Sequence, residues 1–255
     1  MWPTYVINLA DNTERLENAR RELAAQGVEW ARLDAVNGWT LPEETIAEVY
    51  DAQRNARLAK HPLVRPEIGC YLSHVRTWER IAQDEAAGAL VLEDDFRVTG
   101  DLSGTLEALS RDAETAGWDI VKLYSIRSPG RILAPRDIAP GIALGTPYRV
   151  PSTTLGYVIT KSAAARLARV SVPFFRPVDE DHKFFWEAGL DIRIVDPQPL
   201  SLGAQETVTG TVGDTRKRAA RADHRPAWRS TWARLRYQAG YNLRLFRHRF
   251  RGTGE

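Results

Sequence analysis

Three consecutive carboxylates, Glu93, Asp94 and Asp95, directly follow the apolar run Ala89–Leu92. In an extended strand neighbouring side chains point to opposite sides, so Glu93 and Asp95 are expected on one side and Asp94 on the other. Two hard oxygen ligands on one side suit Mg²⁺ or Mn²⁺, and the two carboxylates would repel each other without a cation. The triplet therefore indicates a divalent-metal site that grips a diphosphate, although a solvated acidic turn after a strand would have the same sequence.

Other patterns that carry chemistry are absent from the sequence or weak. There is no Walker A loop, no Gly-rich dinucleotide motif after the first strand and no G-x-S-x-G motif, which disfavours ATPases and nicotinamide enzymes. Cys70 and His74 are four residues apart on an expected helix and could touch, but a buried structural cysteine is the more common case. A glycosidase with paired carboxylates is disfavoured, because adjacent acids at one strand end cannot flank a sugar.

Strands and helices alternate around the triplet. Strands are predicted at 4–9, 28–33, 89–92, 118–124, 155–160 and 191–195, and helices at about 12–26, 42–50, 67–87, 102–115, 162–170 and 179–189. The Pro- and Gly-rich stretch 127–147 is predicted to be a loop with one or two short strands. The alternation predicts an α/β domain with a mainly parallel sheet. Such sheets bind ligands at the carboxyl ends of their strands, and the triplet lies at one of those ends.

The composition is that of a globular protein, with 255 residues of which 43% are hydrophobic and 27% charged. This length supports one or at most two domains. No run approaches the ~20 apolar residues that span a bilayer, and no basic leader precedes the first strand. The single cysteine, Cys70, excludes an intrachain disulfide and a cysteine-rich zinc site. We therefore expect a cytoplasmic protein.

The formal net charge of +2 combines two unlike segments. Residues 215–255 hold 12 Lys and Arg residues and two acids, a charge of +10, whereas residues 1–214 hold 23 bases and 31 acids, a charge of −8. In the C-terminal segment large apolar residues recur every three or four positions, with Ala239 in the gap, at Trp228, Trp232, Leu235, Leu243, Phe246 and Phe250. Such a stripe among arginines is typical of a helix that lies on an anionic membrane. The stripe could instead pack on the acidic domain, and nucleic-acid binding is disfavoured because no recognition motif is present.

Several segments resemble glycosyltransferase family 25, which comprises lipopolysaccharide and lipooligosaccharide galactosyltransferases and their collagen-modifying relatives. The matching segments are, in chain order, Tyr5–Leu9 with Arg15, Arg32–Gly38, Glu67–His74 followed by Trp78, Leu92–Asp95, Thr154–Thr160 and Pro177–Asp179. Their order and spacing agree over roughly residues 4–210. The most diagnostic segment is Glu67–His74.

The resemblance implies a GT-A type fold and an inverting, metal-dependent transfer of a hexose, most often galactose from UDP-galactose. The residues that it assigns to donor binding are Asn8, Leu9, Arg15, Ser73, His74, Glu93 and Asp94, and those that it assigns to the metal, Mn²⁺ or Mg²⁺, are Glu93 and Asp95. For Arg15 a surface ion pair is an alternative. For Ser73 and His74 the alternative is simple helix packing.

The resemblance also implies a catalytic base, a carboxylate that takes a proton from the attacking acceptor hydroxyl. Asp179 matches the family's Pro-Val-Asp. The following Glu180-Asp181-His182 departs from the usual apolar continuation, so Glu180 or Asp181 could be the base instead. Asp179 could also serve only as the N-cap of the helix that follows, and His182 or His224 could reach the metal.

These features predict a catalytic domain at residues 1–214 and a basic amphipathic helix at 215–255. The expected partners are a UDP-sugar donor, a glycolipid or saccharide acceptor of bacterial envelope biosynthesis, and an anionic membrane surface, with no nucleic acid. The helix would hold a peripheral enzyme at the inner face of the cell membrane. The alternative is a non-catalytic protein on a degenerate transferase scaffold, which binds an anionic surface or nucleic acid.

Overall fold

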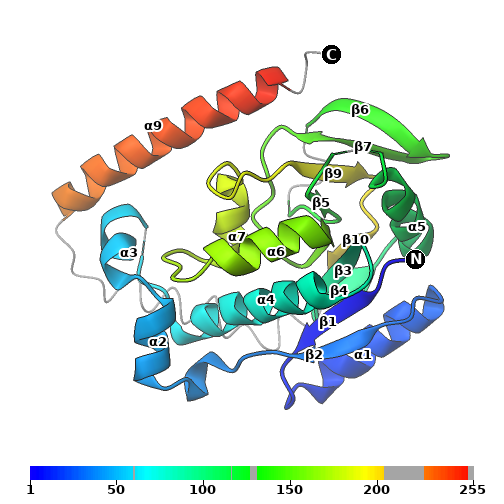
Figure 1. Cartoon of the computed structure of the whole chain (residues 1–255), viewed down its shortest axis with the longest axis horizontal. Coiled ribbons are helices and arrows are strands. Elements are labelled where there is room, and N and C mark those ends of the chain that lie inside the picture. The colour runs from blue at the N-terminus through cyan, green and yellow to red at the C-terminus, as the bar shows by residue number, and fades with distance from the viewer. Residues whose placement is uncertain (60, 116, 127–130, 204–226, 252–255) are drawn as a thin grey trace.

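An eight-stranded sheet forms the centre of the molecule (Figure 1). The computed structural model describes residues 1–59, 61–115, 117–126, 131–203 and 227–251. Across the sheet the strands follow in the order β2 (Ala31–Asp34), β1 (Thr4–Asn8), β3 (Gly88–Glu93), β8 (Gly156–Thr160), β5 (Ile120–Lys122), β9 (Ile192–Asp196), β7 (Ile142–Pro147) and β6 (Ile132–Ala139).

Pairing within the sheet is mixed. β1 pairs in parallel with β2 and β3, and β5 pairs in parallel with β9. β8 runs antiparallel between β3 and β5, and the β6–β7 hairpin adds an antiparallel edge to β9. The α/β class is confirmed, but the sheet predicted to be mainly parallel is mixed. A strand buried on both faces is apolar throughout whichever way it runs, so the sequence of β8 carries no sign of its direction.

Two hydrophobic cores lie on the two faces of the sheet, because alternate side chains of a strand point to opposite faces. In β1, Tyr5 and Ile7 belong to one core and Val6 to the other. The first core is covered by α4 (Arg65–Gln83) and α6 (Lys161–Val170), and the second by α1 (Thr13–Ala25) and α5 (Leu102–Asp112). β3 is buried along its apolar run and emerges only at Glu93, so the acidic triplet begins where the strand leaves the core.

Shorter elements complete the described fold: η1 (Gly38–Thr40), α2 (Glu43–Val49), α3 (Ala52–Leu58), β4 (Phe96–Val98) paired with β10 (Leu200–Leu202), α7 (Val178–Asp181) and η2 (His182–Phe184). The helix predicted for 179–189 is therefore only two short turns. Phe184, Phe185 and Trp186 all contact the C-terminal helix. Three consecutive side chains of a regular helix would point in different directions, so this shared contact requires an irregular backbone.

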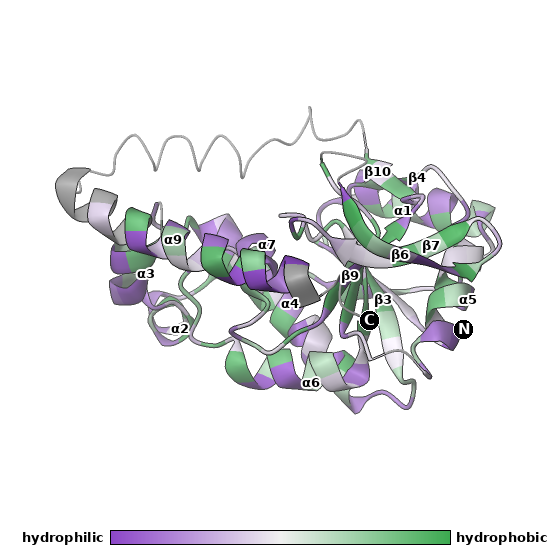
Figure 2. Cartoon of the chain, turned by 90° about the horizontal axis from the view of Figure 1, so that it is seen from above, coloured by the Kyte–Doolittle hydropathy of each residue, from purple (hydrophilic) through white to green (hydrophobic). Residues whose placement is uncertain are grey.

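The C-terminal helix, α9 (Ala227–Arg251), lies along the top of the molecule in Figure 1, beside α3 and α7. It packs on the body through a face that includes Tyr237, Tyr241, Leu245 and His248. Apolar residues of the stripe recognised in the sequence lie on a different face and are exposed, by 70% for Trp232, 56% for Leu235, 55% for Leu243 and 53% for Phe246. Apolar and polar residues alternate along α9 in Figure 2.

The exposed side chains of Trp232, Leu235 and Leu243 therefore do not form the packing surface on the acidic domain that was the alternative left open by the sequence, whereas α9 itself packs on the body through its other face. The predicted domain boundary at residue 214 lies outside the described residues. Within the described part of the chain, we find no helix whose length and apolarity would suffice to cross a membrane.

Candidate active site

Side chains from several strand ends meet at one edge of the sheet. β1 ends at Asn8 and β3 at Glu93, next to each other, and β5 ends at Lys122. β8 runs in the opposite direction, so the segment that leads into it, Thr153–Thr154, reaches the same edge. This edge is where ligands bind in open α/β sheets, and it carries the acidic triplet.

Asp94 faces the β1 side of this edge. Its carboxylate accepts a hydrogen bond of 2.7 Å from Asn8 Nδ2 and one of 3.0 Å from Arg15 Nη1. Arg32 Nε in turn donates to Asn8 Oδ1 at 3.0 Å and fixes the orientation of that amide. Burial raises the pKa of Asp94, and the contacts with Arg15 and Asn8 partly oppose that rise. The structure thus brings together Asn8, Arg15 and Asp94, three residues predicted to bind the donor, and adds Arg32, which the sequence did not assign.

Glu93 faces the opposite side. β3 ends at Glu93, and Asp94 and Asp95 form a turn, so the strand alternation predicted for the triplet does not extend beyond Glu93, and Arg15 lies near both Asp94 and Asp95. Its Oε1 accepts hydrogen bonds from His74 Nε2, at 3.1 Å, and from the Thr154 hydroxyl. Burial acts to raise the pKa of Glu93, but the hydrogen bonds from His74 and Thr154, with the charge of Lys122, outweigh burial and lower it. Glu93 is therefore ionised at neutral pH, with His74 as its support.

A buried chain of hydrogen bonds sets the tautomer of His74. Trp78 Nε1 donates to the Tyr157 hydroxyl at 2.9 Å, and the same hydroxyl lies 2.9 Å from His74 Nδ1. An indole N–H can only donate, so the hydroxyl proton of Tyr157 is directed to Nδ1, and Nε2 carries the hydrogen that reaches Glu93. Fully buried His74 is thus a positioning residue for Glu93.

Asp95 has an unsatisfied carboxylate oxygen. Its Oδ1 is buried and has no hydrogen-bond partner among the described residues, and its Oδ2 lies 3.8 Å from Arg15 Nη1. Burial and the neighbouring Glu93 carboxylate raise the pKa of Asp95 to about 7. Buried oxygen acceptors are normally paired, and two carboxylates close together share a proton unless a cation compensates their charge. The oxygen ligands of Glu93 and Asp95 therefore fit Mg²⁺ or Mn²⁺.

A second group of ligand types lies close by, but it does not fit a metal. Sγ of Cys70, a ring nitrogen of His74 and a carboxylate oxygen of Glu93 lie within 4.8 Å of one another. Burial, with the Glu93 charge, raises the pKa of the Cys70 thiol well above its usual value, so the thiol keeps its proton. Both ring nitrogens of His74 are already hydrogen-bonded.

Two of the predicted donor residues have a different surrounding. Ser73 Oγ accepts a hydrogen bond of 2.8 Å from Val36 N and donates one of 2.7 Å to Gly69 O. These bonds tie α4 to the segment after β2, which is a packing role. Leu9 lies just beyond β1 with 39% of its surface exposed, and its carbonyl oxygen accepts from Asn12 N at 2.9 Å.

Asp181 is held in a structural ion pair. Its two carboxylate oxygens accept from Arg176 Nε and from the Tyr71 hydroxyl. Buried Arg176 also donates to Glu187 at 2.5 Å and to the Tyr237 hydroxyl of α9 at 2.7 Å. With both oxygens hydrogen-bonded, Asp181 is less available than Asp179 or Glu180 to take a proton from an acceptor, and its role as a possible base stays a prediction.

Asp179 and Glu180 remain as candidate bases. α7 begins at Val178 with Pro177 as its N-cap, so Asp179 is not the cap of this helix. Asp179 and Glu180 are both half-buried. Asp179 lies close enough to the cation of Lys122 to act on its pKa.

Buried Lys122 is a site residue that the sequence analysis missed. Its Nζ donates to Thr153 O at 2.7 Å and lies 2.5 Å from His182 Nδ1. Burial lowers the pKa of Lys122 to about 7, while the charges of Asp179 and Glu93 oppose that change. Burial and the Lys122 charge lower the pKa of His182 well below its usual value, so His182 is neutral and its Nδ1 accepts from Lys122. A lysine at the carboxyl end of an otherwise apolar strand is the signal that could have identified it.

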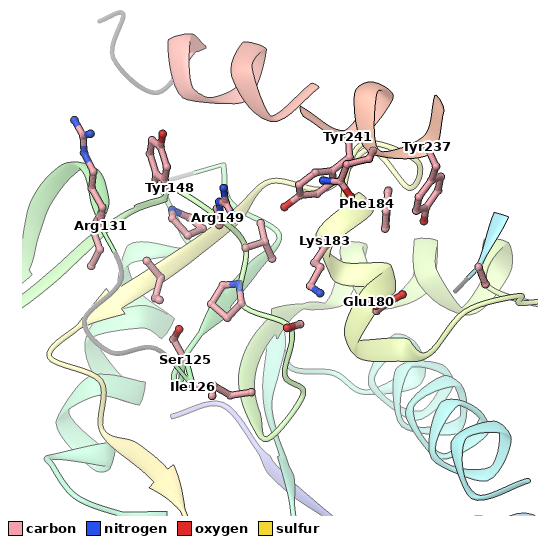
Figure 3. Close-up of a pocket in the computed structure, with 18 of the residues that line it drawn as sticks. Ser125, Ile126, Arg131, Tyr148, Arg149, Glu180, Lys183, Phe184, Tyr237 and Tyr241 are labelled. Carbon is pink, nitrogen blue, oxygen red and sulfur yellow. The ribbon is translucent and has the colours of Figure 1, made fainter. Parts of the chain in front are cut away.

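A cavity of about 700 Å³ lies between α9 and the segments that follow β5 and β7 (Figure 3). Its lining includes Glu180 and Lys183 from the α7–η2 segment, Ser125 from the connection after β5, and Tyr237 and Tyr241 from α9. The triplet and its partners on β1 and α1 do not line it. This side of the molecule therefore has two separate parts. One is the acidic region around Glu93–Asp95, and the other is the cavity below α9.

Comparisons with known proteins agree with this arrangement. The family described as "Glycosyltransferase family 25 (LPS biosynthesis protein)" matches residues 1–128, which include Asn8, Arg15, His74 and the acidic triplet. The chain is 31% identical to procollagen galactosyltransferase 1-A of Xenopus laevis over 185 residues, 69% of this chain and 30% of that protein. It is 27% identical to procollagen galactosyltransferase 2 of Homo sapiens over 254 residues, 89% of this chain and 40% of that protein.

Another relative is described as an inactive glycosyltransferase 25 family member 3 of Homo sapiens, 31% identical over 188 residues, 69% of this chain and 30% of that protein. The chain thus spans between about a third and two fifths of the length of these relatives. The similarity to an inactive relative means that membership of the group alone does not decide whether a chain is active.

Proposed function

Because the chain belongs to glycosyltransferase family 25, we propose that it transfers a hexose from a nucleotide sugar to a hydroxyl group of an acceptor, with inversion at the sugar carbon. The observation that carries this proposal is the unsatisfied Oδ1 of Asp95 beside ionised Glu93. A buried carboxylate pair of this kind is costly unless a cation joins it, and a cation there would face a diphosphate. The mixed α/β sheet with an acidic motif at a central strand end supports a GT-A type fold.

The chain's own residues set the geometry of the donor half. Asn8 and Arg15 hold Asp94, and His74 with Thr154 holds Glu93, so these two carboxylates of the triplet are fixed before a ligand arrives. Mn²⁺ or Mg²⁺ held by Glu93 and Asp95 would act as a Lewis acid for the charge that develops on the leaving diphosphate. Fixed charges that need no reorganisation during the reaction are the main source of such stabilisation.

The proton of the acceptor hydroxyl is taken by Asp179 in this mechanism. Asp179 lies at the boundary between the two halves, where its charge acts on Lys122 from the α7 side. An inverting transfer needs a base on the face of the sugar opposite to the diphosphate, and no covalent intermediate. Glu180, which lines the cavity, is the alternative base.

The proposed donor is UDP-galactose, because two of the relatives are described as galactosyltransferases. The proposed setting is the synthesis of a bacterial envelope glycolipid, which agrees with the family's description as LPS biosynthesis proteins. In this setting the exposed apolar face of α9, with Trp232, Leu235 and Leu243 beside exposed Arg236 and Arg247, supports binding to an anionic membrane. The protein would then be peripheral, at the inner face of the cell membrane.

The test measures UDP release from UDP-galactose with Mn²⁺, and again after EDTA is added. We expect release that depends on the metal and falls at least about a hundredfold in Asp95→Asn, as for the loss of a group that stabilises developing charge. Asp137→Asn, an exposed acid on β6, is the matched control and should keep the full rate.

Full turnover by Asp95→Asn would disprove the metal role. The absence of any thermal shift with UDP, Mn²⁺ and UDP-sugars would instead favour a non-catalytic protein, like the relative described as inactive.

A further inference from the structure

The cavity below α9 is a binding site that the donor chemistry does not use. Its volume of about 700 Å³ is of the size that holds a small ligand. It begins at Glu180, one residue from the proposed base Asp179, and it contains none of the residues that hold the triplet. A ligand in this cavity would therefore sit beside the proposed base and apart from the triplet, which is where an acceptor must lie.

The charge of the cavity is opposite to that of the donor half. Its lining includes Arg131, Arg149 and Lys183, and its one acidic residue among the described lining is Glu180. No ion pair within the described part of the chain involves Arg149 or Lys183, although the body as a whole carries an excess of acids. Cations that lack a protein carboxylate in a concave site are suited to an anionic ligand.

Aromatic side chains complete the lining. Tyr148 lies on one side, and Tyr237 and Tyr241 extend from α9 over the cavity (Figure 3). Amphipathic aromatic rings with a few polar groups form the usual wall of a small-molecule site. Such rings suit the flat apolar faces of sugars, while the cations would bind an attached acidic group.

We propose that this cavity binds the acceptor, and that the acceptor is a saccharide bearing a phosphate or a carboxylate group. The identification of the ligand as an acceptor rests on the proposed function. Binding of an anionic saccharide in the cavity can be measured without turnover. α9 forms the roof of the site, so the C-terminal helix contributes to acceptor specificity. A saccharide with a positive charge is excluded by the same cations.

The roof is also connected to the catalytic segment. The Tyr237 hydroxyl accepts a hydrogen bond of 2.7 Å from Arg176, which is paired with Asp181 in the α7 turn that carries Asp179 and Glu180. The position of α9 and the position of the proposed base thus depend on one buried guanidinium. The same contact gives α9 a defined place over the cavity.

The experiment measures binding of four probes by titration calorimetry: glucose 6-phosphate, glucuronate, glucose and glucosamine, with inorganic phosphate as a fifth. We expect glucose 6-phosphate or glucuronate to bind at least about tenfold more tightly than glucose, as for one charge-assisted hydrogen bond. The stronger of the two identifies phosphate or carboxylate as the group recognised. Inorganic phosphate should bind more weakly than glucose 6-phosphate, because it lacks the sugar.

The double variant Arg149→Gln with Lys183→Gln should lose this preference, and Arg20→Gln with Arg111→Gln, two exposed arginines on α1 and α5, should keep it. Equal binding of glucose and the anionic sugars, or an unchanged preference in the double variant, would overturn the inference. Hydrolysis of UDP-galactose by the same samples reports the donor half separately. If the wild-type protein does not hydrolyse UDP-galactose, the proposed function is refuted. The binding data then decide the assignment of the cavity by themselves.

Discussion

The two halves of the sheet edge are built in different ways. The donor half is acidic, and its side chains hold one another through short, buried hydrogen bonds that converge on Glu93 and Asp94. The acceptor half is basic, and its lining comes from segments as distant in the chain as Ser125 and Tyr241. The first half requires a cation and the second offers cations. The comparison teaches that one edge of a sheet can offer opposite charges to two substrates when different helices and loops supply the residues of the two sites.

The largest expected effect concerns Arg176, which joins the two halves from the acceptor side. Arg176→Met would leave the largely buried Asp181 carboxylate without its cation, which costs about 3–5 kcal/mol of unfolding free energy, whereas exposed Glu187 keeps Arg54 at 4.0 Å. Urea unfolding measures the loss. Arg111→Met, which removes an exposed pair on α5, should change the free energy by less than about 0.5 kcal/mol. Equal effects in the two variants would show that the buried pair does not hold the acceptor half together.

The boundary between the halves is tested by the two remaining acids. Asp179→Asn should lower kcat for transfer by about 10²–10⁴-fold, the usual contribution of a general base, with little change in donor binding. Glu180→Gln should affect KM for the acceptor more than kcat, because Glu180 lines the cavity. The reverse pattern would assign the base to Glu180 and move the reacting hydroxyl deeper into the acceptor half.

The donor half is the part that the sequence predicts best. The position of the triplet at the end of a buried strand is predicted correctly, because the apolar run before it is a local signal, whereas the strand alternation predicted within the triplet gives way to a turn after Glu93. The predicted proximity of Asn8 and Arg15 to Asp94 rests on the resemblance to the glycosyltransferase family. Lys122 was not identified as a site residue from the sequence. A single lysine in an apolar strand has no evident role until its partners Thr153 and His182 are known.

The acceptor half could not be predicted for a physical reason. Arg176 has its partners at Asp181, Glu187 and Tyr237, and only folding brings these residues together. The face of α9 that packs on the body was also hidden, because the apolar stripe that dominates the sequence is the exposed face. The buried face consists instead of Leu245 with two tyrosines and a histidine, and the last three are weaker apolar signals.

The hydrogen-bond chain behind Glu93 gives a sharper test of the donor half. Tyr157→Phe would leave Trp78 Nε1 and His74 Nδ1 without their shared partner, and His74 would no longer be held in the tautomer that donates to Glu93. Outer groups of this kind typically change metal affinity by about 10–100-fold. The affinity for Mn²⁺ in the presence of UDP should fall by that factor. Tyr148→Phe, in the acceptor half, is the matched control and should leave it unchanged.

The pH dependence follows from Asp95. Its pKa rises from 3.8 in the unfolded chain to about 7 in the fold, so the folded state binds this proton more readily. Without a metal, the unfolding free energy should therefore decrease as the pH rises from about 4 to about 7, and Asp95→Asn should remove this slope. A metal competes with the same proton, so Mn²⁺ affinity should increase about tenfold between pH 6 and pH 8. A flat Mn²⁺ affinity over this range would contradict the assignment of Asp95 as a ligand.

The smallest effect is expected at the outer face of α9, which is the opposite side of the roof from the cavity. Trp232→Ser with Leu243→Ser should weaken sedimentation with anionic vesicles by about three- to tenfold, because two exposed apolar side chains no longer enter the membrane interface. Asn242→Ser, exposed on the same helix, should bind vesicles as the wild type does. UDP release with a water-soluble acceptor should stay constant in all three proteins. Unchanged sedimentation of the double variant would contradict the proposed membrane contact. The remaining role of α9 would then be to cover the acceptor site with its inner face.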